Sequence, residues 1–122
     1  MVRTRLKIKP GAELDGLTIE AIGAIVACLS VWTLLKREWV TITEGTGAKH
    51  EVADSAHTVD YEGDEYYGYA IDVRTRDLPG GCKGEMAARA ASYLRSTLGG
   101  AYDVVLHDTH IHIEYDKRAL NL

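Results

Sequence analysis

The stretch His107-Asp108-Thr109-His110-Ile111-His112-Ile113-Glu114-Tyr115 decides the fold prediction, because it places three of the five histidines within six residues. Side chains alternate between the two faces of a β-strand. If residues 110–115 form a strand, His110, His112 and Glu114 share one face, while Ile111, Ile113 and Tyr115 share the other. The isoleucine face can be buried in a core. The opposite face then carries two imidazoles and a carboxylate, for which a divalent metal ion is the most favourable partner.

The composition predicts one globular domain covering residues 1–122, since 46% of the residues are hydrophobic and 26% are charged. The net charge of −4 argues against nucleic acid as a partner. The two cysteines are too few for a disulfide framework, and Cys28 lies in an apolar helical pattern that predicts a buried thiol. No stretch reads as a signal peptide or a membrane span. We therefore expect a cytoplasmic protein without a membrane partner. We also expect it to be a monomer.

Hydrophobic periodicity predicts two helices, each with a core-facing stripe. The first stripe runs from Leu17 to Leu35, with Asp15 or Thr18 as the cap, and the second helix covers residues 83–98. Strands are expected at residues 38–44, 69–73, 102–106 and 110–115, with a short strand or arm within residues 1–13 and a long loop at 45–67. The predicted fold class is α+β, with a small antiparallel sheet backed by two helices.

Two more residues are candidates for a metal site. His57 lies in the long loop, and Asp72 lies on the predicted strand 69–73, where it alternates with the small Ala70. Gly68 precedes this strand and permits close backbone approach. His57, Asp72 and one histidine of the last strand would give two nitrogens and one oxygen around a tetrahedral Zn²⁺ with its fourth position open, as in catalytic zinc sites.

The segments Ser55-x-His57, Gly68-x-Ala70-x-Asp72 and His110-x-His112 resemble the S-x-H…G-x-A-x-D…H-x-H signature of the LAS-type zinc peptidases. That family includes D-alanyl-D-alanine carboxypeptidases and dipeptidases, the penicillin-insensitive murein endopeptidase and the hedgehog amino-terminal domain. The resemblance covers roughly residues 14–116. The stretch Ala70-Ile71-Asp72-Val73-Arg74-Thr75-Arg76-Asp77-Leu78-Pro79 is also similar to small phage-encoded members.

The resemblance implies a hedgehog-like and DD-peptidase-like fold with His57, Asp72 and His112 as zinc ligands. It places His107 and His110 in the active site as catalytic residues. It also implies a role for Ser55 in holding the substrate or the loop. Arg74 is a candidate for binding a substrate carboxylate, although a basic residue just after a strand is more often a solvated charge.

Two features depart from the family pattern. The first ligand histidine and the aspartate are usually seven positions apart, whereas His57 and Asp72 are 72 − 57 = 15 apart. The extra residues fall around Asp60–Tyr67, and His50 is the alternative ligand. Many relatives also carry an acidic residue at the position of His107, which a histidine can replace as general base.

The resemblance therefore implies a zinc peptidase that cuts amide bonds in peptidoglycan peptides next to D-amino acids, of the phage-encoded type. Two alternatives stay open: a metal-binding domain of the same fold without hydrolytic activity, and a structural component of a phage particle.

Overall fold

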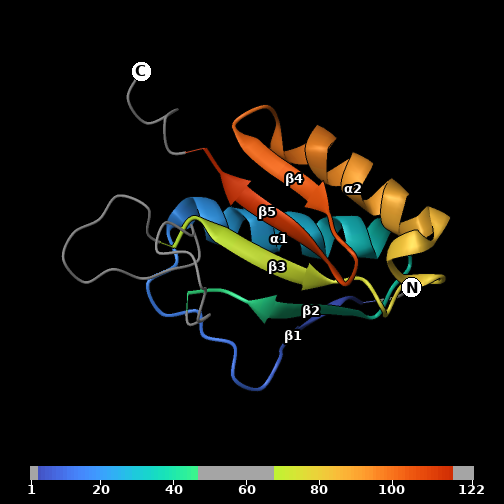
Figure 1. Cartoon of the computed structure of the whole chain (residues 1–122), viewed down its shortest axis with the longest axis horizontal. Coiled ribbons are helices and arrows are strands. Elements are labelled where there is room, and N and C mark those ends of the chain that lie inside the picture. Colours follow the sequence, from blue (N-terminus) through green and yellow to red (C-terminus); the bar gives the residue numbers. More distant parts are fainter. Residues whose placement is uncertain (1–2, 47–67, 117–122) are drawn as a thin grey trace.

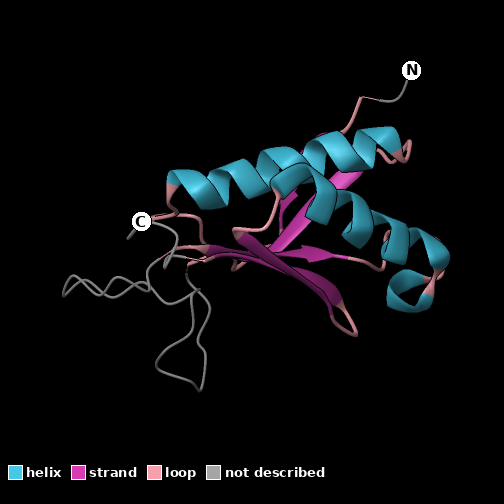
Figure 2. Cartoon of the chain, turned by 90° about the horizontal axis from the view of Figure 1, so that it is seen from above, coloured by secondary structure: helices cyan, strands magenta, loops and turns pink. Residues whose placement is uncertain are grey.

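The computed structural model describes residues 3–46 and 68–116. Its elements are, in chain order, β1 (Arg5–Ile8), α1 (Ile19–Leu34), β2 (Trp39–Glu44), β3 (Ala70–Arg74), a 3₁₀ turn η1 (Gly81–Lys83), α2 (Glu85–Leu98), β4 (Tyr102–Leu106) and β5 (His110–Tyr115). The five strands form one sheet, and both helices lie on the same face of it (Figures 1 and 2). The predicted α+β class, a small sheet backed by two helices, is confirmed.

The strand order is β1-β2-β3-β5-β4, and one pairing differs from the antiparallel expectation. β1 and β2 are parallel, with Arg5 opposite Trp39 and Ile8 opposite Ile42. The reason is the connection between them: the chain crosses over through α1 and re-enters the sheet in the same direction, as parallel neighbours require. The other three pairings, β2–β3, β3–β5 and β4–β5, are antiparallel.

The core lies between the sheet and the two helices. From the sheet, Ile71, Val73, Ile111 and Ile113 point into it and are fully buried. The helices contribute their predicted stripes, and the small alanines of α2 allow close packing against its neighbours. Cys28 is buried as predicted, and burial raises the pKa of its thiol far above the usual range. The helix residues that complete the core are Ala21, Ala24, Ile25, Ala27, Cys28, Val31, Trp32, Ala87, Ala90, Ala91 and Leu94.

The ends of the helices refine the sequence prediction. Thr18, and not Asp15, caps α1, because its hydroxyl accepts a hydrogen bond from the backbone N–H of Ala21 at 3.3 Å. The second helix starts at Glu85 rather than at residue 83, since the turn η1 precedes it.

Neither helix in residues 3–46 and 68–116 is long and apolar enough to cross a membrane.

Candidate metal centre

The pairing of β3 with β5 builds the site. The two strands are antiparallel, and their register sets Asp72 directly opposite His112, with Ala70 opposite Glu114 and Arg74 opposite His110. The isoleucines that alternate with these histidines face the helices. As the alternation predicts, His110, His112 and Glu114 therefore share the face of the sheet that the helices do not cover.

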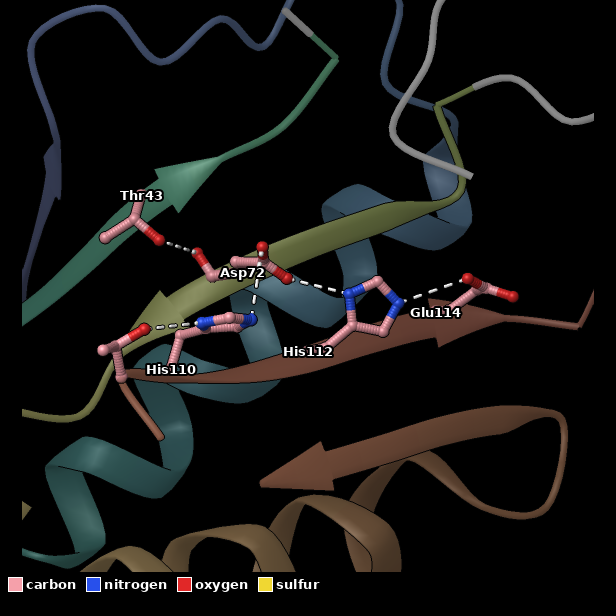
Figure 3. A network of polar contacts seen from close by, with 6 residues as sticks. Thr43, Asp72, His110, His112 and Glu114 are labelled. Atoms are coloured by element: carbon pink, nitrogen blue, oxygen red, sulfur yellow. Dashed lines mark hydrogen bonds and ion pairs between the residues drawn. The ribbon is translucent and has the colours of Figure 1, made fainter. Parts of the chain in front are cut away.

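A network of short polar contacts connects these side chains (Figure 3). The Nδ1 atom of His112 lies 2.8 Å from Oδ1 of Asp72, and its Nε2 atom lies 3.2 Å from Oε1 of Glu114. The Nε2 atom of His110 lies 3.6 Å from the second carboxylate oxygen of Asp72. Asp72 is buried, with a relative exposure of 4%. The buried carboxylate of Asp72 on β3 thus contacts two imidazoles of the neighbouring strand β5.

The hydroxyl groups of two threonines contact residues of this network. The hydroxyl of Thr43, on β2, donates a hydrogen bond to the backbone carbonyl oxygen of Asp72 at 3.4 Å. The hydroxyl of Thr109 lies 3.0 Å from Nδ1 of His110. The second contact turns Nε2 of His110 toward Asp72, because the two ring nitrogens lie on opposite sides of the imidazole.

His112 carries the largest electrostatic perturbation in the network. Burial by itself lowers the pKa of this imidazole, but the hydrogen bonds with Asp72 and Glu114 outweigh burial and raise the pKa to about 9. The metal-free site therefore holds His112 as an imidazolium between two carboxylates at neutral pH. The two carboxylates of Asp72 and Glu114 thus stabilise a positive charge between them, which the protonated ring of His112 carries.

His107 completes a group of three histidine rings. Its ring centroid lies 5.0 Å from that of His110 and 6.2 Å from that of His112. Its backbone N–H donates a hydrogen bond to the carbonyl oxygen of His110 at 2.8 Å, which closes the β4–β5 turn. His107 itself is exposed. The structure therefore brings His107 and His110 together with the Asp72–His112 pair.

The spacing of Asp72 and His112 bears on whether they can share a metal ion. Two ligands at about 2.0–2.1 Å from a tetrahedral zinc ion lie roughly 3.3 Å apart. The observed 2.8 Å between Oδ1 and Nδ1 needs only a small opening to reach that value. Within residues 3–46 and 68–116, however, no group of three or more His, Cys, Asp and Glu side chains is arranged to hold a metal ion. Among the residues that the structure describes, Asp72 and His112 are thus the two sequence-predicted zinc ligands that lie close together.

The remaining sequence candidates lie outside the described residues. These are His57, the alternative ligand His50, Ser55 and the extra stretch Asp60–Tyr67. Arg74 is described: it is partly exposed at the end of β3 and lines a cavity of about 610 Å³ beside Asp72 and His110.

Sequence reasoning did not identify Thr43 or Thr109 as parts of the network. Thr43 lies on a predicted strand, so its presence in the sheet could be expected. Its position next to Asp72 depends on the β2–β3 register, which has an irregularity between Ile42 and Glu44. No pattern in the sequence encodes that irregularity.

Comparison of the chain with protein-family models, with curated proteins and with solved structures finds no match. Any function must therefore be argued from the residues and their geometry.

Proposed function

We propose that this protein is a zinc-dependent peptidase that hydrolyses amide bonds next to D-amino acids in peptidoglycan peptides. The observation that carries the proposal is the buried carboxylate of Asp72, 2.8 Å from Nδ1 of His112, on the sheet face away from the helices. The resemblance of Ser55-x-His57, Gly68-x-Ala70-x-Asp72 and His110-x-His112 to the LAS-type signature adds the substrate class.

Asp72 and His112 would hold the zinc ion together with His57, or with His50 in its place. Glu114 supports this assignment, since its contact with Nε2 of His112 would keep a proton on Nε2 when Nδ1 gives up its own proton to bind the metal. When bound, zinc lowers the pKa of a coordinated water to about 7 and polarises the carbonyl group of the substrate.

The protein's own histidines would move the protons. His107 and His110 lie side by side next to the Asp72–His112 pair, and an imidazole ring can both accept and donate a proton. In the proposed reaction, one of them accepts a proton as the amide is attacked and returns it to the leaving amine. Thr109 would keep the ring of His110 oriented for this task through its contact with Nδ1.

Metal analysis tests the ligand assignment. Protein purified without a histidine tag should carry close to one zinc ion per chain, while Asp72→Ala and His112→Ala should lose it. His107→Ala is the matched control and should keep its zinc, because His107 belongs to the same cluster without being a proposed ligand. A wild-type zinc content below a tenth of an equivalent would contradict the proposal.

Incubation with purified muropeptides tests the activity. The wild type should release new amine ends, and His107→Ala or His110→Ala should slow the release by roughly 10²–10⁴-fold, the usual contribution of a general acid or base. If zinc is bound but no amine ends are released, the protein is a metal-binding domain without peptidase activity. That result would reject the proposed reaction.

A further inference from the structure

The outer face of α1 differs from that of the neighbouring helix. Both helices lie on the same face of the sheet, so each has one side toward the core and one side toward solvent (Figure 2). A surface helix normally carries polar and charged side chains on its outer side. The helix α2 follows this rule, because its exposed residues are Glu85, Ala88, Arg89, Ser92, Arg95, Ser96 and Thr97. The exposed residues of α1 carry no charge and are Ile19, Ile22, Val26, Ser30, Thr33 and Leu34.

Four large apolar side chains of α1 are well exposed. The relative exposure is 80% for Ile19, 49% for Ile22, 56% for Val26 and 63% for Leu34. The core does not use these side chains, because the opposite stripe of the same helix already packs against the sheet and α2. Residues three and four positions apart are neighbours on a helix surface, so these side chains form one apolar patch. A contiguous apolar patch on a folded domain marks an interaction site.

The exposed residues of α1 are arranged symmetrically about Val26. Ile22 and Ser30 lie four positions before and after Val26, and Ile19 and Thr33 lie seven positions before and after it. At about 100° per residue, these five residues form a seam within an arc of about 80° around the helix. If two copies of α1 pack antiparallel with a two-fold axis at Val26, each isoleucine lies opposite a smaller side chain, Ser30 or Thr33. Large side chains opposite small ones let two helices interlock.

Charges at the two ends of the seam also favour a second copy in the antiparallel direction. Asp15 is exposed before the start of α1, and Lys36 is exposed after its end. Antiparallel packing brings the Asp15 end of one copy beside the Lys36 end of the other, whereas parallel packing would bring like charges together. Burial of Thr33 would leave no hydrogen bond unmade, because its hydroxyl donates to the carbonyl oxygen of Leu29 at 2.7 Å.

We propose that α1 is a dimerisation surface, on which the outer face of α1 from a second copy of this chain packs antiparallel across a two-fold axis at Val26. A helix of 16 residues is about 24 Å long and about 10–12 Å across, so its outer face is smaller than the roughly 800 Å² that each partner buries in a standard interface. The dimer should therefore dissociate in the micromolar range. The candidate metal centre lies on the opposite face of the sheet and stays accessible in both copies.

Sedimentation velocity of the full chain at increasing concentration tests for the dimer. The mean mass of the wild type should rise from that of one chain toward that of two chains between about 1 and 200 µM. Val26→Glu should raise the dissociation constant at least about tenfold, because it sets two carboxylates against each other at the axis. Val105→Glu is the matched control, since Val105 is 42% exposed on β4, outside the seam, and should change the constant less than about threefold. A wild type that stays monomeric at about 200 µM, as the sequence analysis expects, or a dimer that survives Val26→Glu would overturn the inference.

Disulfide cross-linking tests the antiparallel arrangement, in a Cys82→Ser background that leaves only the buried thiol of Cys28. Helices that pack about 8–10 Å apart bring the two Val26 Cα atoms to the distance of about 4.4–6.8 Å that a disulfide spans. Val26→Cys should therefore form linked dimers under mild oxidation. Leu34→Cys should not, because antiparallel packing separates the two Leu34 positions by about 24 Å. No cross-link at Val26, or equal cross-linking at Leu34, would overturn the proposed packing, and thermal unfolding of each variant confirms that it is folded.

Discussion

At the scale of single residues, His112 makes the stability of the metal-free protein depend on pH. Its folded-state pKa of about 9 lies above its ordinary value of 6.5. The ion pairs with Asp72 and Glu114 therefore contribute fully below pH 6.5, and this contribution is lost as the pH rises toward 9. We expect the melting temperature in EDTA to fall by several degrees between pH 6.5 and 9. A His112→Gln variant should lack this part of the slope, and a His107→Ala variant should retain it.

The Asp72 side chain offers a second prediction at this scale. Asp72→Asn keeps the shape of the residue but removes the charge that faces two histidines. The pKa of His112, followed by NMR titration in the absence of metal, should move down toward its ordinary value. A pKa that stays near 9 in this variant would show that Glu114 alone holds the imidazolium.

At the scale of elements, β5 has one face in the core and the other in the site. Ile113 is fully buried, so Ile113→Ala should lower the free energy of unfolding by about 2–5 kcal/mol in urea titrations. Val105→Ala on the neighbouring strand β4 is the control, because Val105 is 42% exposed. This variant should change stability much less. Equal losses in the two variants would contradict the burial pattern.

Individual elements show what could be predicted from the sequence. The alternation of histidine and isoleucine in residues 110–115 predicted the observed strand and its two faces, and the apolar stripes predicted both helices. Alternation assigns a side chain to a face, but it does not set which residues of two strands lie opposite each other. The contacts of Asp72 with His112 and Thr43 therefore required the structure. The parallel β1–β2 pair could not be predicted for a similar reason, since four residues of mixed polarity carry no direction signal.

At the scale of the whole molecule, zinc binding and folding should be coupled. A ligand that binds only the folded chain adds about 2.7 kcal/mol of stability at a hundred times its dissociation constant. Zinc should therefore raise the melting temperature of the wild type, measured by differential scanning calorimetry, and leave that of His112→Ala unchanged. If zinc does not change the melting temperature of the wild type, the folded protein does not form the proposed zinc site.

Thr46 and Gly68 are both hydrogen-bonded to the short stretch of chain before α1. The backbone N–H of Thr46 donates to the carbonyl oxygen of Glu13 at 2.8 Å. The backbone N–H of Thr18 donates to the carbonyl oxygen of Gly68 at 3.1 Å. Gly68 has a φ of 66°, and a side chain there would collide with the backbone of Gly16.

These two hydrogen bonds fix the positions of Thr46 and Gly68 relative to the start of α1. The chain on either side of these two residues is therefore held in place by its own contacts. The fold of residues 3–46 and 68–116 is thus held by contacts that do not depend on how many residues separate Thr46 from Gly68.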